Sequence, residues 1–534
     1  METATAAKVA TSSRLRVWLR RYRLVCGAFL LVLLLGLPTL IVPFSTDASI
    51  FALGARTILS GGVLYRDFWE IKSPGIYFAY ALAFVPFGQH MVSVRVLDLV
   101  NTALAMGAIY LLGRRFFGER AGIFAGCLYG VTYLTRADLD GLGEAESFVA
   151  LPVLLSILLY RPNSQRGADA GALLSGILLG LAFSIKVSAG FYVVALPAIE
   201  LMFAERPLRV APALKRLSIA AAGFLVIAAV FAVYLIAGGA LGDFIDIQRL
   251  HVWPYTSLHW SPPGESYVHF FARATHDYVV DNLFLVVPAV GALFVALAGV
   301  RRKETALVVI LAGASLLTVW SQGKFFRYHY LAMIFPLAVL SGFAIDRVIA
   351  YVGGSRFLAQ RWAAYGLAGA FLVLLTPSLL SNPYDQYRHF LGNATGRLSQ
   401  ADNEGQWGEF FRCNHEVVDY VKANGNGDNS TFVWGLWPVI YWWVDEPLVS
   451  RFIFDTPLTA TWAPEMWRSE LVNDLQTHQP HFIIVAHGGV QPWMTGTSET
   501  AEERIQDYPG LKQILSQDYW PVYGNELFEV FERY

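Results

Sequence analysis

The feature that most constrains this chain is a series of apolar runs, each about as long as a membrane's hydrocarbon core is thick. A helix needs roughly 20 apolar residues to cross that core. About eleven segments qualify: 24–43, 91–113, 121–137, 147–160, 171–186, 188–204, 218–238, 282–300, 304–320, 331–351 and 362–381. Charged residues make up 15% of the 534 residues, against roughly 25% in soluble proteins. We therefore expect a polytopic α-helical membrane protein.

The distribution of lysine and arginine orients these spans, because short cytosolic loops are rich in both. The tail 1–23 is strongly basic and is expected to stay in the cytosol. Alternation then places five further loops inside, and each is basic: Arg114, Arg115 and Arg120; Arg161 and Arg166; Arg206, Arg209, Lys215 and Arg216; Arg301, Arg302 and Lys303; Arg356 and Arg361. An odd number of spans leaves residues 382–534 outside.

Two predicted outer loops of the transmembrane module, 24–381, are too long to be simple turns. Loop 44–90 opens with residues 47–59, whose apolar spacing predicts a short amphipathic helix in the membrane interface. Loop 239–281 is aromatic and rich in turn-forming residues. Ordered loops of this length are often functional lids, and a passive interfacial loop fits the pattern equally well.

Residues 382–534 have a different character. Short β-type runs occur at 431–435, 481–486 and 527–533, with helix-like stretches at 465–476 and 498–508 between them. Alternating strands and helices predict an extracytoplasmic α/β domain.

Composition excludes several classes of protein. The net charge is −1 and no basic stripe appears, so no nucleic-acid partner is expected. Three cysteines give no disulfide framework. No zinc, nucleotide or Ser-His-Asp signature stands out. No cofactor is predicted, and a bridging divalent cation stays an open alternative.

Carboxylates near the outer ends of spans are the first candidates for chemistry. Asp47 follows the first span, where a carboxylate at membrane depth is costly and therefore a functional candidate; the alternative is a helix N-cap. Asp138, Asp140, Glu144 and Glu146 form a second acidic cluster, for which a solvated loop is the alternative. Glu146 adjoins the apolar run from Phe148 and is expected to lie deepest.

Basic residues in outer loops need a reason, because such loops are normally poor in them. The exceptions are Arg56, Arg66, Lys72, Lys186, Arg249, Arg273, Lys324 and Arg327. Binding an anion is one reason. Lys324, Arg327 and His329 lie between two spans, which suggests a phosphate site; anchoring to lipid headgroups is the alternative, as it is for Lys72. In such a site a carboxylate accepts a proton from an acceptor hydroxyl, and cations stabilise a departing phosphate.

Several stretches carry a resemblance to a known family. They are 47–55 and 61–74 in the first outer loop, 87–95, 113–118, 141–148, 180–186, and 324–337 in a late loop. Together they resemble the glycosyltransferase C superfamily, closest to bacterial relatives of the dolichyl-phosphate-mannose protein mannosyltransferases and the lipid A aminoarabinose transferase. The resemblance is patchy but collinear over roughly residues 24–350.

The resemblance implies a polyprenyl-phosphate sugar donor and inversion at the anomeric carbon. Asp47 matches the catalytic aspartate of the first loop, and Lys72 the lysine that contacts the donor phosphate. Glu146 takes the place of the second acidic residue, with Glu144 and Asp140 as rivals. Two departures blur the subfamily: Asp47-Ala48 stands where the family often has Asp-Glu, and Lys72-Ser73-Pro74 where it has Lys-Pro-Pro.

The candidate site residues are therefore Asp47 and Glu146 as catalytic groups; Lys72, Arg327, His329, Lys324 and Arg66 at the donor phosphate; and Asp140, Glu144, Lys186 and Tyr330 as further candidates. The expected function is transfer of a sugar to a lipid, glycan or protein acceptor outside a bacterial inner (plasma) membrane, with Asp47 as general base. A transporter or flippase of a lipid-linked glycan precursor is the alternative, although most spans lack the mid-membrane charges it would need. A catalytically inactive scaffold is a third reading.

Overall fold

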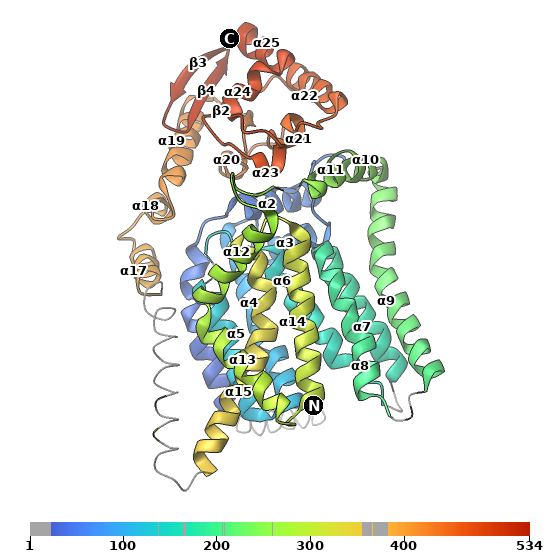
Figure 1. The fold of residues 1–534 in the computed structure, drawn as a ribbon. Helices are drawn as coiled ribbons and strands as arrows, with labels where there is room; N and C mark the ends of the chain where they lie inside the picture. Colours follow the sequence, from blue (N-terminus) through green and yellow to red (C-terminus); the bar gives the residue numbers. More distant parts are fainter. Residues whose placement is uncertain are drawn as a thin grey trace, which may run out of the picture.

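The computed structural model describes residues 23–136, 138–163, 167–205, 207, 209–258, 260–354, 362, 366 and 383–534. The tail 1–23 and the eleventh predicted span, 362–381, lie outside this range except for Arg23, Trp362 and Gly366. A helical bundle occupies most of the chain up to residue 354, and residues 383–534 lie against one end of it (Figure 1). We call that end the sheet side, because residues 383–534 contain a β-sheet.

Long apolar helices form the bundle. By length and composition, six described segments can cross a membrane: Arg23–Ile41, which ends in η1 (Leu37–Ile41), α4 (Met91–Phe117), α7 (Ala168–Ile185), α9 (Val210–Ala237), α14 (Arg302–Gln322), and Arg327–Val352, which joins η4 (Arg327–Tyr330) to α15 (Leu331–Gly354). A seventh span results if α12 (Tyr267–Asp281) and α13 (Leu283–Leu297) are counted together, although the chain bends by 96° between them.

Three more predicted spans coincide with helices that fall short of this measure. They are α5 (Glu119–Arg136), α6 (Ala145–Leu159), and η2 (Val187–Val194) continued by α8 (Ala195–Phe203). In α5, Glu119, Arg120 and Arg136 put three charges into 18 residues. Helices thus cover all ten predicted spans that fall in the described range, and the total of eleven stays a prediction.

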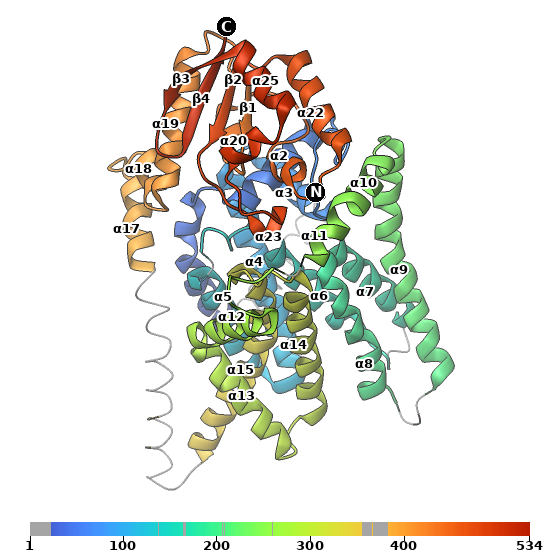
Figure 2. The ribbon, with the colours of Figure 1, turned by 45° about the horizontal axis from the view of Figure 1, so that its top comes forward.

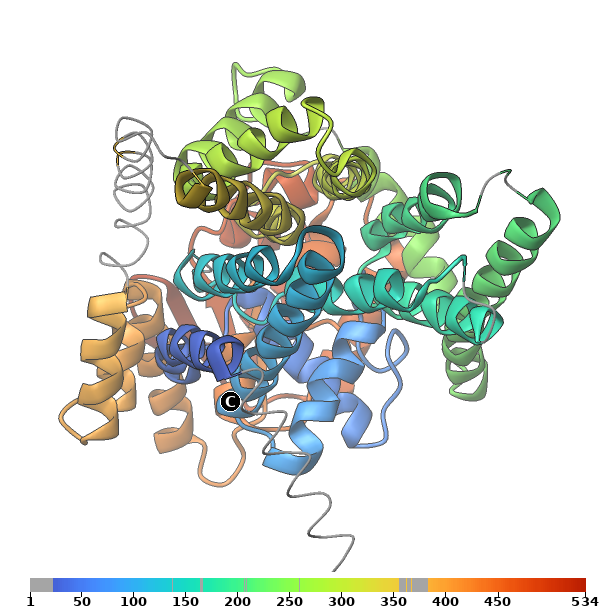
Figure 3. The same ribbon diagram turned by 90° about the horizontal axis from the view of Figure 1, so that it is seen from below.

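Small residues let α7 and α9 pack closely. A Cβ built on Gly176 would lie 1.8 Å from the carbonyl oxygen of Ala220, and one on Gly223 would lie 2.2 Å from that of Leu173. Gly180 repeats the spacing of Gly176 one turn later, the small-xxx-small pattern of membrane helix pairs. Seen from below, α7, α8 and α9 lie together on one side of the bundle (Figure 3).

The first loop is helical over much of its length, with α2 (Thr46–Leu59) and α3 (Gly75–Phe87). The helix expected over 47–59 is present, and its place in the membrane interface stays a prediction. Residues 48–55 of α2 are all buried, because the helix packs between the bundle and residues 383–534 (Figure 2). Five of these eight residues are Ala, Ser or Gly, which makes close packing around the helix sterically feasible.

The predicted irregular loop 239–281 is also largely helical. It contains α10 (Leu241–Ile247), the π-helical turn η3 (Gln248–Val252), α11 (Trp253–Ser257) and α12. α10 and α11 lie at the sheet side of the bundle, close to residues 383–534 (Figure 2).

Residues 383–534 form helices around a four-stranded sheet. The strands are β1 (Thr431–Trp434), β2 (Phe482–Ala486), β3 (Tyr519–Gly524) and β4 (Phe528–Arg533), in the order β1-β2-β4-β3. β1 and β2 are parallel, and the other pairs are antiparallel. The helices are α17 (Pro383–Ala394), α18 (Gln400–Gly405), α19 (Glu409–Asn424), α20 (Val439–Val444), α21 (Thr456–Thr459), α22 (Glu465–His478), α23 (Pro492–Thr495), α24 (Ala501–Gln506) and α25 (Pro509–Asp518). The sequence does not predict β3.

Arg451 and Trp69 join this C-terminal part to the first loop. Arg451 donates to the carbonyl of Tyr65 at 2.9 Å and pairs with Asp243 at 2.9 Å. The backbone N–H of Trp69 donates to the carbonyl of Arg451 at 3.0 Å. The buried indole ring of Trp69 packs on Phe452 and Trp467. Apolar and polar contacts together therefore fix the C-terminal part over the first loop.

Arg95 on α4 holds two loops in place from within the bundle. Its side chain is 1% exposed, and it donates to the carbonyls of Val42 at 3.1 Å, Pro43, and Leu142 at 2.7 Å. Val42 and Pro43 lead into α2, and Leu142 leads into α6. A buried guanidinium needs several acceptors, and these carbonyls belong to both loops.

We predict that Arg95→Lys lowers the free energy of unfolding by about 2–5 kcal/mol, because each buried carbonyl left without a donor costs about 1–3 kcal/mol. Thermal unfolding of the purified protein in detergent measures this. The matched control is Arg115→Lys on the exposed face of the same helix, for which a change within about 0.5 kcal/mol is expected. Equal melting curves for the two variants would contradict the role of Arg95.

Candidate active site

A cavity of about 290 Å³ lies where the first loop, the α5–α6 loop and the C-terminal part meet. Its lining residues come from both parts of the chain: Thr46, Asp47, Ile50, Trp69, Glu70, Ile71, Lys72, Asp140, Glu144, His251, Tyr255, Phe326, Tyr328, Leu436, Phe454, Thr456, Trp493 and Met494. We call it the Asp47 cavity. Four of the eleven predicted site residues line it: Asp47, Lys72, Asp140 and Glu144.

Asp47 lies in the first turn of α2, but it does not cap the helix. Ser45 is the N-cap, and its side chain accepts from the Ala48 N–H at 3.1 Å. The carboxylate of Asp47 is therefore available to the cavity, where its Oδ2 lies 2.7 Å from the Lys72 ammonium. The Tyr328 hydroxyl donates to the same oxygen at 3.4 Å. The capping alternative for Asp47 is wrong.

The charges around Asp47 set its protonation state. Burial raises the pKa of Asp47, but Lys72 and then Lys186 outweigh this effect and leave the pKa below its usual value. Burial lowers the pKa of Lys72, but Asp47, Glu144 and Glu70 together raise it above its usual value. Both groups are therefore charged at neutral pH.

The other carboxyl groups of the cavity are shifted in the opposite direction. Burial and the charge of Asp47 raise the pKa of Glu144 well above its usual value. Burial raises the pKa of Glu70 to about 7 and that of Asp140 to about 6. Carboxyl groups with pKa values pushed apart are a common property of acid–base sites. Asp47 is the one of these four carboxyl groups whose pKa lies below its usual value.

Glu146 and Lys186 form a neighbouring buried ion pair. Glu146 is in the first turn of α6, and Lys186 ends α7. The Lys186 ammonium lies 5.8 Å from the centre of the Tyr328 ring, so Tyr328 contacts both this pair and Asp47. Lys186 adds a second positive charge close to the cavity, although Glu146 itself does not line it.

The structure does not bring the predicted late-loop cations to Asp47. Arg327 pairs with Asp281, and its side chain is 79% exposed. Lys324 is buried and donates to the carbonyl of Leu258 at 2.7 Å; burial lowers its pKa to about 8. Lys324 therefore fixes the end of the α11 segment.

The remaining predicted residues also lie outside the Asp47 cavity. His329 is buried against Phe326 and Tyr328. Tyr330 stacks on Tyr278 and shares a hydrogen bond of 2.9 Å with Thr275. Arg66 pairs with Asp67 at 2.6 Å and donates to the carbonyl of Gly238, because its backbone position directs it toward the end of α9.

Sequence reasoning missed several lining residues. The polar side chains of Glu70 and Tyr255 line the cavity. In the sequence, both look like ordinary loop residues, so nothing marks them as site residues. Trp493, Met494 and Thr456 come from the C-terminal part and cover the cavity. Tyr328 lies in the late-loop stretch 324–337, and its hydroxyl, not its cationic neighbours, reaches Asp47.

Two larger cavities adjoin this region. One of about 760 Å³ is lined by residues of α5, α12 and the late loop, including Arg136, Arg327 and Tyr328. Tyr328 lines both this cavity and the Asp47 cavity. The other, of about 780 Å³, is an apolar groove between η2 and α14, lined by Gly190, Phe191, Val193, Val194, Phe271, Ile310, Gly313, Ala314, Leu316, Leu317 and Trp320.

Cys413, Glu416 and Glu526 form the one group of three close metal-ligand atoms found in the described parts of the chain, within 4.8 Å of one another. Arg412 pairs with both carboxylates. None of the three lines the Asp47 cavity.

Comparison with known proteins places this geometry in context. A family model described as dolichyl-phosphate-mannose-protein mannosyltransferase matches residues 71–236, which include Lys72, Glu144 and Lys186. No curated protein matches the sequence.

Solved structures match nearly the whole chain. ArnT from Cupriavidus metallidurans in the apo state is 14% identical with a TM-score of 0.58, covering 94% of this chain and 96% of that one. The same protein bound to undecaprenyl phosphate is 14% identical with a TM-score of 0.55, covering 96% and 98%. The oligosaccharyltransferase AglB from Archaeoglobus fulgidus, in complex with an inhibitory peptide and a dolichol-phosphate, is 11% identical with a TM-score of 0.50, covering 88% and 70%.

The fold is thus the one seen in ArnT and AglB. The family model and the two structural likenesses confirm the resemblance to the glycosyltransferase C superfamily that the first-loop motif carries. Within that class, the family whose model matches is the dolichyl-phosphate-mannose-protein mannosyltransferases.

We predict that Glu144 stays protonated to a higher pH than an ordinary glutamate, because burial and then the charge of Asp47 raise its pKa well above the usual value. Infrared difference spectroscopy of the wild type against Glu144→Gln should show loss of a protonated-carboxyl C=O stretch. Asp67→Asn is the control, since Arg66 holds the pKa of Asp67 below its usual value and no such band should be lost. A Glu144→Gln spectrum without this loss would show that Glu144 is ionised.

Proposed function

We propose that the chain transfers a hexose or pentose from a polyprenyl-phosphate carrier to an acceptor hydroxyl, with inversion and with Asp47 as the general base. The observation that carries the proposal is an ionised Asp47 paired with Lys72 in a cavity at the sheet side of a membrane bundle. The acceptor is a lipid, a glycan or a protein.

The proposed step follows from the charges of the cavity. The acceptor oxygen attacks the anomeric carbon from the face opposite the phosphate, and the bond between that carbon and the phosphate oxygen breaks. The carrier phosphate leaves with the electron pair, and Asp47 takes the proton of the acceptor hydroxyl. A pKa below the usual value keeps Asp47 ionised, as a base requires, whereas burial and the charge of Asp47 disfavour the ionised form of Glu144.

Lys72 suits the developing negative charge on the carrier phosphate. An ammonium has three donors, and the one directed at Asp47 leaves two for phosphate oxygens. Lys186 supplies a second positive charge nearby. A phosphate leaving group needs charge neutralisation and not a proton, so two lysines without a general acid are sufficient.

The apolar groove suits the polyprenyl chain. It is lined by η2, which begins directly after Lys186, and by α14. A carrier whose phosphate lies near Lys72 and Lys186 therefore has an apolar path from its headgroup into the bilayer. That ArnT was solved with undecaprenyl phosphate supports a carrier of this type.

The charge distribution supports an extracytoplasmic site in a bacterial inner membrane. The basic loop residues Arg114 and Arg115 end α4, 27 residues long, which begins just after the first loop. At 1.5 Å per residue, α4 spans roughly 40 Å, so this basic end lies across the membrane from the Asp47 cavity. Under the positive-inside rule, Asp47 and residues 383–534 are then outside.

Asp47→Asn is expected to lower the transfer rate by about 10²–10⁴-fold, the usual contribution of a positioned base. Transfer is measured in proteoliposomes with polyprenyl-phosphate sugars, and mass spectrometry of cell-envelope glycans and glycoproteins with and without the protein identifies the product. Asp67→Asn, on the same loop but outside the cavity, is the control. Near-normal transfer by Asp47→Asn refutes the base, and translocation of an unchanged donor would favour the transporter.

Gly313→Phe is expected to raise the KM for long-chain donors at least about tenfold and to leave short-chain donor analogues unaffected. A Cβ on Gly313 meets no atom within 4 Å, so the ring enters the groove without disturbing the fold. Burying several methylenes at about 0.8 kcal/mol each accounts for this magnitude. Gly107→Phe on α4, equally open, is the control. An equal change in KM for long-chain and short-chain donors would show that the groove does not bind the polyprenyl chain.

A further inference from the structure

A second polar cavity lies within the C-terminal part. It has a volume of about 230 Å³ and lies between α21, α22, α24 and α25. Thr459, Arg468, Glu499, Arg504, Asp507 and Tyr508 contribute its polar lining. Ligand pockets for drug-sized molecules run from roughly 300 to 1,000 Å³, so this cavity suits a single small unit.

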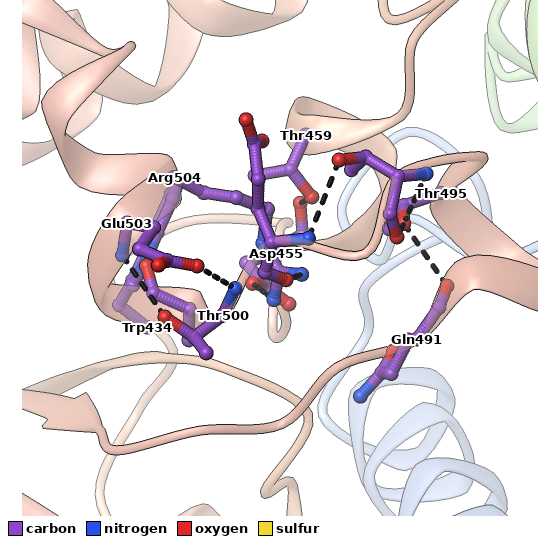
Figure 4. Close-up of polar contacts among 11 residues, drawn as sticks. Trp434, Asp455, Thr459, Gln491, Thr495, Thr500, Glu503 and Arg504 are labelled. Atoms are coloured by element: carbon purple, nitrogen blue, oxygen red, sulfur yellow. Dashed lines mark hydrogen bonds and ion pairs between the residues drawn. The ribbon is translucent and has the colours of Figure 1, made fainter.

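Local sequence positions Arg504 in this cavity. Thr500 and Glu503 form a capping box that starts α24, and the Trp434 indole donates to the carbonyl of Ala501 at 2.8 Å. These contacts orient α24 so that Arg504 lies beside Asp455 (Figure 4), at a distance of 2.6 Å. Arg504 also donates to the carbonyl of Glu499 at 2.8 Å.

The Arg504–Asp455 pair is buried yet incompletely satisfied. The two side chains are 2% and 0% exposed, and in the described part of the chain neither Arg504 Nε nor Asp455 Oδ1 has a hydrogen-bond partner. Buried polar groups of a native protein are normally paired, and each exception calls for an explanation. Because Arg504 lines the cavity, an unpaired donor is present at its wall.

Two chain segments line both this cavity and the Asp47 cavity, each with different residues. In one segment, Phe454 and Thr456 line the Asp47 cavity, whereas Leu458 and Thr459 line the second cavity. In another segment, Trp493 and Met494 line the first, and Thr497 and Glu499 the second. Thr456 and Leu458 are two residues apart, so their Cα atoms are at most about 7 Å from each other. The two cavities are therefore neighbours along both segments, although no residue lines both.

We propose that this second cavity binds a neutral sugar unit of the acceptor, so that the acceptor is a glycan or a glycosylated molecule. This rests on the proposed function, since it identifies the acceptor of the same transfer. A hydroxyl of the adjacent unit then lies in the Asp47 cavity, beside the general base.

Charge and chemistry favour a neutral sugar. The guanidinium groups of Arg468 and Arg504 donate hydrogen bonds, and the carboxylates of Glu499 and Asp507 accept them. Sugar hydroxyls need both, whereas an anion would be repelled by the carboxylates. The Tyr508 hydroxyl donates to the carbonyl of Arg468, which holds the aromatic ring in place as an apolar face for the sugar's C–H groups.

Binding is tested on the full chain in detergent by saturation-transfer NMR with methyl glycosides of neutral hexoses and pentoses. At least one glycoside should bind, and the double variant Glu499→Gln/Asp507→Asn should weaken it at least about tenfold, since hydrogen bonds to charged groups are lost. Both side chains are exposed at the rim, so the fold is retained. Thr497→Tyr, which places a ring in the cavity, should also abolish binding.

The matched control is Glu446→Gln/Asp518→Asn, which removes the same charge from the C-terminal part outside the cavity and should bind as the wild type does. Absence of glycoside binding, equal binding by all variants, or tighter binding of methyl glucuronide than of neutral glycosides would overturn the proposal.

A transfer assay separates this proposal from the proposed function. Asp47→Asn should bind the glycoside normally, and Glu499→Gln/Asp507→Asn should raise the KM for the acceptor with the KM for the donor unchanged. Full transfer by Asp47→Asn would contradict the role of Asp47 as general base and leave the sugar site unaffected. An unchanged acceptor KM in the double variant, with active wild type, defeats the sugar site alone.

Discussion

The site depends first on Arg95, a cation buried in the bundle. Its guanidinium binds carbonyls on both sides of the Asp47 cavity, before α2 and before α6. The carboxyl groups of the cavity lie on or beside loops, and the position of a loop depends on the contacts that fix it. A buried charge is costly by itself, and here its hydrogen bonds bring Asp47 and Glu144, which are distant in sequence, to one cavity.

Electrostatic differences then separate otherwise similar carboxyl groups. Asp47, Glu70 and Glu144 share one small cavity with one lysine. The Lys72 ammonium lies 2.7 Å from Asp47, and the negative charge of Asp47 in turn raises the pKa of its neighbours. Burial raises the pKa of Glu70 and Glu144, and the Asp47–Lys72 pair keeps that of Asp47 below its usual value. The same lysine is what makes the cavity suitable for a phosphate.

The sequence predicted those features that depend on residues close together in the chain. Apolar length located the membrane helices, and the first-loop motif brought Asp47 and Lys72 together correctly. The prediction that Arg327 lies near Asp47 is wrong. The positive-inside rule indicates on which side of the membrane a charge lies, but not with which residue it pairs, and Arg327 pairs with Asp281 on another helix. β3 was missed because Pro521 and Gly524 disrupt the strand pattern. The covering residues Thr456 and Trp493 have no local signal, since they act only through contacts distant in sequence.

Those covering residues have a consequence for how the protein is made. Asp47 and Lys72 are translated first, whereas Trp493 and Met494, which complete the cavity wall, leave the ribosome only after more than 400 further residues. Until then the ion pair faces open solvent, where water competes with any incoming hydroxyl. A chain without its C-terminal part thus has Asp47 and Lys72 but lacks the residues that enclose them.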